Sequence, residues 1–257
     1  MRSLVQPLYT SALRVLTAGR GLPWRVDERT TLRIDPRCRW IRHAGYEADV
    51  VSYLRAHIAP GEVCLDVGAH VGFYVLQMAQ WTAPDGRIVA FEPNPTARAV
   101  LESNVALNRL AGRVTIEPMA AGAARSTAEL FHADDTSGLS RLGAPNRNGA
   151  TRASVRVPVV TLDDYCAQTS LRPDWILIDT EGAELAVLEG AAALLETPVQ
   201  VVVEMHGSLW EDPAATAARF QAFLRARGRT AVPITGQDDP FADYGTVVLR
   251  RSEDRRA

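Results

Sequence analysis

A stretch of ten residues, Val63 to Gly72, constrains the fold of this 257-residue chain more than any other part of it. Its first half reads Val-Cys-Leu-Asp-Val, which is apolar at nearly every position and too short for a core helix, so it predicts a fully buried strand. Gly68 and Gly72 follow, and residues without Cβ let the backbone turn and approach a ligand closely. From about Val71 the spacing of apolar residues predicts a helix whose free N–H groups point back at this turn.

A second buried strand, residues 88–92, ends in Glu92, where a carboxylate can accept hydrogen bonds from ribose hydroxyls. A dinucleotide site would need Gly-x-Gly-x-x-Gly, whereas this chain has Asp66-x-Gly68-x-x-x-Gly72 with His70 between the glycines. The pattern resembles motif I of the class I S-adenosylmethionine-dependent methyltransferases, whose ligand carries ribose and adenine but no phosphate. The alternative is a structural turn that binds no nucleoside.

Length and composition limit the other choices. The chain can bury one substantial core, so one α/β domain with an extension is the simplest division. A net charge of −2 gives no support for a nucleic-acid partner or an acidic membrane partner. Three isolated cysteines show neither metal spacing nor a disulfide framework, which indicates a cytoplasmic protein. The sequence contains no apolar run of about 18 residues, so no integral membrane segment is predicted. The sequence leaves open whether the protein forms a homo-oligomer.

Strand and helix patterns alternate along most of the chain. Further strands are expected at residues 31–35, 114–117, 126–131, 154–160, 175–179, 199–204 and 246–249. Helices are expected at residues 4–16, 47–58, 95–108, 161 onward, 183–195 and 214–227. This alternation predicts right-handed βαβ units and a mostly parallel sheet with helices on both faces. The chain then divides into an N-terminal extension (residues 1–45), a Rossmann-like domain (46–250) and a charged tail (251–257).

Polar residues collect where the later strands end. In an open parallel sheet, ligands bind beyond the carboxyl ends of the strands. Asp179 follows a buried strand, so its carboxylate could face a sulfonium, orient an acceptor hydroxyl or take its proton. His206, beyond the strand that ends at Glu204, is the other candidate base, because imidazole titrates near neutrality. Alternatively, Asp179 caps the following turn, and Glu181 or Glu184 complements a helix dipole.

The same acidic residues could also form a metal site. Asp179, Glu181, Glu204 and His206 could bind a divalent cation through hard oxygen ligands and one imidazole. Their spacing lacks the regularity that would make a metal site specific, so no metal is predicted from the sequence.

The order of motifs resembles the FkbM family of methyltransferases. The residues that carry this resemblance are Tyr46-Glu47, Asp66 to Gly72, Ala90 to Pro93, Asn104 to Asn108, Val157 to Asp164, Ile178 to Glu184 and Val203 to His206. The resemblance implies a seven-stranded class I fold, S-adenosylmethionine as methyl donor, and O-methylation of a small-molecule or glycan acceptor. It implies that Asp179, Glu181 and His206 face that acceptor. The residues expected at the cofactor site are Glu47, Asp66, Gly68, His70, Gly72, Glu92, Pro93 and Asn94.

The chain departs from the family pattern at two places. His70 stands where the family usually has Asn, and Gly122-Ala123 stands where Gly-Asp is common, which puts an adenine contact at that loop in doubt. Substrate choice is expected to lie in the extension and in residues 132–152, a stretch typical of a lid, a binding loop or disorder.

Two other functions compete with methyl transfer. A nicotinamide-dependent oxidoreductase or epimerase lacks support, because neither its glycine pattern nor a Tyr-x-x-x-Lys pair is present. A non-catalytic nucleoside-binding scaffold would keep the fold and lose turnover.

Overall fold

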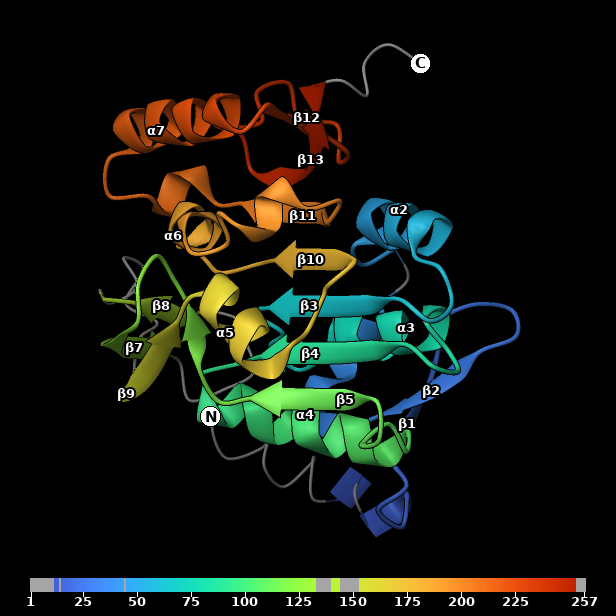
Figure 1. Cartoon of the computed structure of the whole chain (residues 1–257). Helices are drawn as coiled ribbons and strands as arrows, with labels where there is room; N and C mark the ends of the chain where they lie inside the picture. Colours follow the sequence, from blue (N-terminus) through green and yellow to red (C-terminus); the bar gives the residue numbers. More distant parts are fainter. Residues whose placement is uncertain (1–11, 14, 44, 133–139, 144–152, 253–257) are drawn as a thin grey trace.

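A seven-stranded sheet forms the centre of the protein (Figure 1). The computed structural model describes residues 12–13, 15–43, 45–132, 140–143 and 153–252. The strand order is β12 (Arg229–Pro233), β13 (Gly245–Arg251), β11 (Gln200–Met205), β10 (Trp175–Ile178), β3 (Val63–Val67), β4 (Arg87–Phe91) and β5 (Val114–Glu117). The strands from β11 to β5 are parallel, and β13 is antiparallel to both of its neighbours. The predicted mostly parallel seven-stranded sheet is confirmed.

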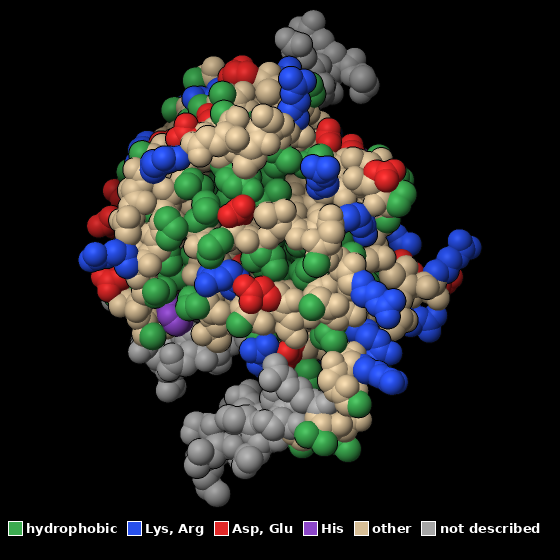
Figure 2. All heavy atoms as spheres, turned by 60° about the horizontal axis from the view of Figure 1, so that its bottom comes forward, with side chains coloured by type: hydrophobic (Ala, Val, Ile, Leu, Met, Phe, Trp, Pro, Cys, Tyr) green, Lys and Arg blue, Asp and Glu red, His purple; other side chains and the backbone are tan. Residues whose placement is uncertain are grey.

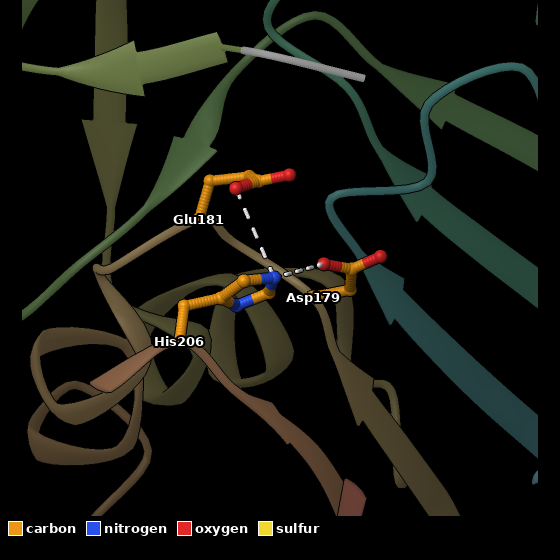
Figure 3. A group of neighbouring side chains, drawn as sticks. All are labelled: Asp179, Glu181 and His206. Atoms are coloured by element: carbon orange, nitrogen blue, oxygen red, sulfur yellow. Dashed lines mark ion pairs between the residues drawn. The ribbon is translucent and has the colours of Figure 1, made fainter. Parts of the chain in front are cut away.

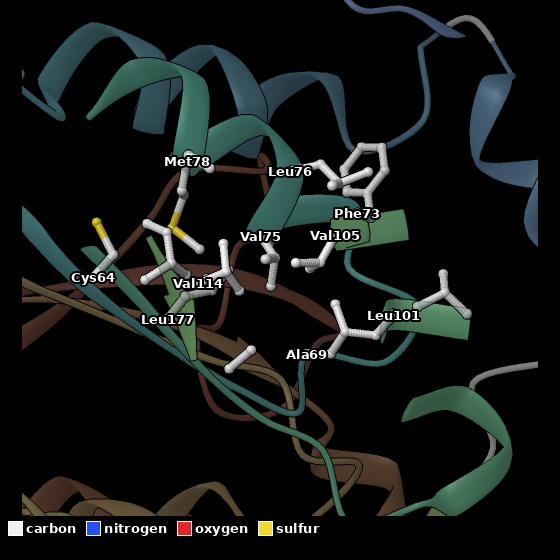
Figure 4. Close-up of a cluster of buried hydrophobic side chains, with 14 of the residues drawn as sticks. Cys64, Ala69, Phe73, Val75, Leu76, Met78, Leu101, Val105, Val114 and Leu177 are labelled. Atoms are coloured by element: carbon white, nitrogen blue, oxygen red, sulfur yellow. The ribbon is translucent and has the colours of Figure 1, made fainter. Parts of the chain in front are cut away.

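Helices cover both faces of this sheet, because alternate residues of each buried strand point to opposite sides. On one face lie α2 (Ala48–His57), α3 (Phe73–Trp81) and α4 (Pro95–Leu107). On the other face lie α5 (Leu162–Thr169), α6 (Glu184–Glu189) and α7 (Pro213–Ala226). Figure 4 shows part of the first core, where Val75 and Met78 of α3 and Val105 of α4 lie against Cys64 of β3 and Leu177 of β10.

The strand order reverses between β3 and β10. From β3 the chain proceeds to β4 and β5 on one side, and β10 proceeds to β11 on the other. At such a switch point the connections leave in opposite directions, so a crevice opens at the carboxyl ends of the strands. The crevice is therefore expected at the tips of β3 and β10.

A second, four-stranded sheet lies beside the first. It consists of β6 (Ala120–Ala121), β9 (Ala153–Val160), β7 (Ser126–His132) and β8 (Ser140–Leu142), in that order. Strands β7 and β9, which correspond to the strands expected at residues 126–131 and 154–160, pair antiparallel. Leu130, Val157 and Val159 form a small core of their own with Ala120.

The N-terminal segment is part of the main core. It contains β1 (Leu22–Arg25), β2 (Thr31–Ile34) and the 3-10 segment η1 (Pro36–Arg42), and its buried residues share one cluster with α3 and α4. Asn104 of α4 makes this connection: its Oδ1 accepts the backbone N–H of Asp35 at 2.6 Å, and its Nδ2 donates to the Val71 carbonyl at 2.7 Å. Asn108, one turn later, is bonded to the backbone of Arg33 in both directions.

Some sequence expectations differ from the structure. The helix expected over residues 183–195 ends at Glu189, and the carbonyl of Gly190 accepts the N–H of Asp163 at 3.0 Å instead of continuing the helix. The carboxylate of Asp163 then accepts the N–H groups of Ala193 and Leu194 and starts a new turn, η2 (Leu194–Glu196). Strands β1, β6, β8 and β12 were not predicted, and Arg251, which we assigned to the tail, ends β13.

Other expectations concern the termini and the surface. Most of the helix expected at residues 4–16 lies outside the described residues. Within the described part, no helix is long and apolar enough to cross a membrane. The chain contains 28 arginines and no lysine. Figure 2 shows one face of the molecule, on which arginine side chains are interspersed with acidic ones.

Replacing Asn104 by alanine should destabilise the protein by about 2–4 kcal/mol, because it leaves a buried N–H and a buried carbonyl without partners. Chemical denaturation measures this loss. Glu102→Ala, on the exposed side of the same helix, should change the free energy of unfolding by less than about 0.5 kcal/mol. Equal effects of the two substitutions would contradict the role given to Asn104.

Candidate active site

A cavity of about 1050 Å³ opens at the carboxyl ends of β3, β4, β10 and β11. Its lining includes Gly68 after β3, Glu92 after β4, Asp179 after β10 and His206 after β11. Residues of η1, β8 and the loop before β13 complete the wall. The cavity thus lies at the topological switch point and collects the polar strand tips that the sequence singled out.

The carboxylate of Glu92 is held by two backbone amides. The N–H of His70 donates to Oε2 at 2.6 Å, and the N–H of Asn94 donates to Oε1 at 2.7 Å. His70 reaches this place through a left-handed backbone conformation, with φ of 50°. Burial raises the pKa of Glu92 to about 7, and the two amide hydrogen bonds act in the opposite direction. The carboxylate is therefore oriented at the strand tip before any ligand binds.

Gly68 is required by its neighbouring strand. Its φ is 89°, and a Cβ there would lie 1.8 Å from the backbone carbonyl oxygen of Asp179. The N–H of Asp179 donates to the Val67 carbonyl at 2.9 Å, which brings the two strand ends together. The sequence assigned the glycine to close approach by a ligand, whereas the structure shows that it also admits the backbone of β10.

The predicted cofactor residues divide into two groups. Those that line the cavity are Glu47, Gly68, His70, Glu92 and Pro93. Asp66, Gly72 and Asn94 lie behind the lining. Asp66 is buried inside β3, Gly72 precedes α3 with its Cα against Leu101, and the Asn94 side chain caps α4 by accepting the Thr96 N–H.

Aromatic side chains form the wall next to Glu47. Trp40 and Tyr46 lie edge to face with centroids 5.4 Å apart, and Tyr46 and Phe73 are 4.9 Å apart. The hydroxyl of Tyr74 donates to Glu47 Oε2 at 3.3 Å. The buried Nε1 of Trp40 has no hydrogen-bond partner among the described residues, and Trp40 lines the cavity. Residues of the extension therefore line the cavity, whereas its predicted part in substrate choice stays a prediction.

At the other end of the cavity, Asp179, Glu181 and His206 lie together (Figure 3). Nε2 of His206 is 3.8 Å from Asp179 Oδ1 and 3.8 Å from Glu181 Oε2. Glu181 has a left-handed backbone, with φ of 50°, in the turn between β10 and α6. The three residues that the sequence assigned to the acceptor are thus brought to one place.

Glu184 orients the histidine, which the sequence did not predict. Its side chain is fully buried, and its Oε1 lies 2.9 Å from His206 Nδ1 and accepts the Gly182 N–H at 2.7 Å. Its Oε2 accepts the indole N–H of Trp210 at 2.8 Å. The sequence placed Glu184 only in the first turn of a helix. The residues around Glu184 in the sequence do not indicate that His206 and Trp210 contact it in the fold.

A second carboxyl lies beside Asp179. Glu204 of β11 raises the pKa of the Asp179 carboxyl, and its Oε1 accepts a hydrogen bond from the Tyr244 hydroxyl. Tyr244 lines the cavity and lies edge to face on the His206 ring, with centroids 5.5 Å apart. Glu204 was noted in the sequence as a strand-tip acid, but Tyr244 lies in a loop whose pattern carries no functional signal.

Burial and mutual repulsion raise the pKa values of acidic side chains in the cavity. Burial, with the adjacent Glu204, raises the pKa of Asp179 well above its usual value, and burial also raises that of Glu181. For His206, burial opposes the charged form, but the hydrogen bond and charge of Glu184 outweigh it and raise the pKa to about 9. This end of the cavity therefore favours positive charge.

Comparisons with known proteins agree with this geometry. The family model described as "Methyltransferase FkbM domain" matches residues 66–230. The chain is 32% identical over 230 residues to the 31-O-demethyl-FK506 methyltransferase FkbM of Streptomyces tacrolimicus, covering 78% of this chain and 85% of that protein. The chain belongs to the FkbM family of methyltransferases. This FkbM-family protein is thus an enzyme that takes its methyl group from S-adenosylmethionine, and the nicotinamide-dependent alternative is set aside.

Other relatives extend the comparison. The hexuronic acid methyltransferase AglP of Haloferax volcanii is 26% identical over 215 residues, covering 83% of this chain and 81% of that protein. A solved structure, a putative rRNA-methylase from Clostridium thermocellum, matches with a TM-score of 0.52 at 11% identity, covering 79% of this chain and 93% of that one. At that identity the likeness concerns the class I fold alone.

The residues present fit S-adenosylmethionine. An oriented carboxylate at the tip of the second parallel strand suits ribose hydroxyls, and the Trp40 indole N–H and the buried Thr180 hydroxyl lack partners among the described residues. Apolar side chains at Phe91, Ala121 and Leu130 line the cavity wall and suit a planar base. Gly122, where the family pattern is broken, is not part of the lining.

Asp66 should make stability depend on pH. Burial first, and the charge of Glu92 second, raise its pKa to about 8. Between about pH 4 and pH 8 the folded protein keeps a proton that the unfolded chain releases, so stability falls as pH rises across this window.

Asp66→Asn removes this titration and should flatten the curve by up to about 1.4 kcal/mol per pH unit. Thermal melting from pH 5 to pH 9 without cofactor measures it. Asp85→Asn, at an exposed position, should leave the wild-type slope unchanged, and parallel curves for all three proteins would refute the assignment.

Proposed function

We propose that this FkbM-family protein O-methylates a hydroxyl group of a sugar, a glycan or a hydroxylated natural product. One observation carries the proposal: a single cavity joins the oriented Glu92 carboxylate to the Asp179, Glu181 and His206 group. A methyl donor and an alcohol can therefore be held side by side in the same cavity. Proximity of this kind supplies much of the acceleration of a displacement reaction.

The donor end is assigned to residues on the tips of β3 and β4. Glu92 accepts the ribose hydroxyls, while Gly68 and His70 form the turn beneath the nucleoside. Glu47 and Trp40 offer an acceptor and a donor to the methionine part of the cofactor. Bound there, S-adenosylmethionine supplies a methyl group on a positively charged sulfur, which departs as a neutral thioether.

The acceptor end is assigned to the tips of β10 and β11. Asp179 and Glu181 accept hydrogen bonds from the alcohol, and Glu184 keeps His206 directed toward them. As the new carbon–oxygen bond forms, the hydroxyl proton passes to a carboxylate of this group. Because this end of the cavity favours positive charge, it also suits a reaction centre that begins with a cation.

The acceptor class rests on the relatives and on the surface. The relatives with printed acceptors carry FK506 or hexuronic acid in their names, and both are hydroxylated small molecules or sugars. The net charge of −2 offers no electrostatic support for a nucleic acid. Ser140 and Leu142, from the described part of the predicted substrate loop, line the cavity and are assigned to acceptor choice. Buried free cysteines at 38, 64 and 166 support a reducing, cytoplasmic location.

Glu92→Ala should weaken binding of S-adenosylhomocysteine by about 10- to 100-fold, because it removes a charged acceptor worth about 1.5–3 kcal/mol. Titration calorimetry measures the affinity, and thermal melting checks that the variant is folded. Glu102→Ala serves as the control. A Glu92→Ala protein with wild-type affinity would show that this carboxylate does not hold the cofactor.

Asp179→Asn should reduce methyl transfer by about 100-fold or more, since it removes an oriented carboxylate at the reacting oxygen, while cofactor affinity stays near wild type. Transfer is followed with labelled methyl donor over a panel of sugars, glycans and hydroxylated natural products. Asp238→Asn, a surface substitution of the same kind, should retain full activity. Full activity of Asp179→Asn would remove this residue from the reaction, and a scaffold would bind cofactor without any transfer.

A further inference from the structure

The acceptor end of the cavity has the donor set of a cation site. One oxygen of Asp179, one oxygen of Glu181 and Nε2 of His206 all lie within 4.8 Å of one another. They come from the segments that follow β10 and β11, so the sheet itself holds them in place. Figure 3 shows the imidazole nitrogen directed at both carboxylates.

His206 supplies an observation that acidic residues alone would not. The residue is 6% exposed, and its Nδ1 is engaged by the buried Glu184. Nε2 is directed at Asp179 and Glu181, yet at 3.8 Å from each it makes no hydrogen bond to any residue that the structure describes. A histidine whose other nitrogen is held by a carboxylate is the usual arrangement of a metal-bound imidazole.

Among the described residues, no arginine forms an ion pair with Asp179 or Glu181, although Arg37, Arg39 and Arg42 line the same cavity. Glu47, Asp179, Glu181 and Glu204 all line the cavity. Among the described residues, the ion pairs of Asp179 and Glu181 involve only His206. The nearby Arg141 donates through Nη2 to the Leu209 carbonyl at 2.7 Å. Its positive charge acts to lower the pKa of Glu181 without forming an ion pair with it.

The spacing is close to what a cation needs. Bonds of about 2.1–2.2 Å place neighbouring ligand atoms about 3 Å apart and opposite ones about 4.3 Å apart. The observed pairs at 3.8 Å therefore need movements of less than about 1 Å. Two carboxylates with one imidazole suit an octahedral cation such as Mn²⁺ or Mg²⁺ better than a soft metal.

We propose that Asp179, Glu181 and His206 bind one divalent cation of the Mg²⁺ or Mn²⁺ class, with its open positions facing the cavity. This inference rests on the proposed function and refines it: one oxygen of each carboxylate binds the cation, which fixes the acceptor oxygen and lowers the pKa of the alcohol. As the carbon–oxygen bond forms, the hydroxyl proton passes to the second, unbound oxygen of one of these carboxylates. Glu184 is then a positioning residue that directs Nε2 at the ion. An acceptor with two adjacent hydroxyls would fill two of the open positions.

Manganese is the probe that tests the site directly. The full chain is treated with chelator, and Mn²⁺ is titrated while electron paramagnetic resonance follows the free ion. We expect about one ion per chain, bound below about 1 mM, and a pulsed spectrum with nitrogen coupling from one imidazole. No bound ion, or a bound ion without nitrogen coupling, would overturn the site, because acids alone would then explain the binding.

Matched variants locate the ion. His206→Asn should abolish the nitrogen coupling, and Asp179→Asn and Glu181→Gln should each weaken Mn²⁺ binding by about ten-fold or more. Glu189→Gln removes a carboxylate of α6 that pairs with Arg219 outside the cavity, and it should bind Mn²⁺ as the wild type does. Unchanged binding in His206→Asn would refute the assignment, and melting curves check that each variant is folded.

Two further measurements separate this inference from the proposed function. Calorimetry with S-adenosylhomocysteine and labelled methyl transfer are each run in Mg²⁺ and in chelator. Transfer that continues unchanged in chelator would reject the cation and leave the methyltransferase assignment standing. Absence of any transfer to hydroxyl acceptors in Mg²⁺ would count against the proposed function. The manganese spectrum would still test the metal site, because it does not depend on activity.

Discussion

The active site depends on the close approach of two parallel strand ends. Gly68 lies against the Asp179 carbonyl with no room for a Cβ, and the Asp179 amide is bonded to Val67. This contact places the glycine turn after β3 and the acids after β10 on either side of one crevice. A side chain at position 68 would push β3 and β10 apart and separate the two halves of the cavity.

Several acidic side chains lie at this crevice, and the free-energy cost of burying each carboxyl group is offset in a different way. Glu92 receives two backbone amides, and Glu184 receives an indole, an amide and an imidazole nitrogen. Asp66 is buried with Oδ2 unpartnered among the described residues, so it depends on protonation. Asp179 and Glu181 line the cavity, where solvent or a ligand can contact them. The site therefore combines rigid, satisfied carboxylates with a few that a cationic ligand would stabilise.

The N-terminal segment contributes to both stability and the site. We divided the chain at residue 45, yet Leu32 and Ile34 share a core with α3 and α4, and Asn104 bonds to Asp35 and Val71. The same segment carries Trp40, which lies on the cavity wall beside His70. Its packing on α4 thus couples the fold of the extension to the shape of the cavity.

Local patterns in the sequence determined the buried strands, most helices and the acids at the strand tips, because burial, periodicity and glycine turns act within a few residues of each other. Asp179, Glu181, Glu92 and His206 could be named from position alone. Only the tertiary structure decided which tips meet, that Glu184 holds His206 across 22 residues of sequence, that Asp66 lies behind the wall and that α6 ends at Glu189. These outcomes depend on strand order and on contacts between distant segments, and neither leaves a periodic signal in the chain.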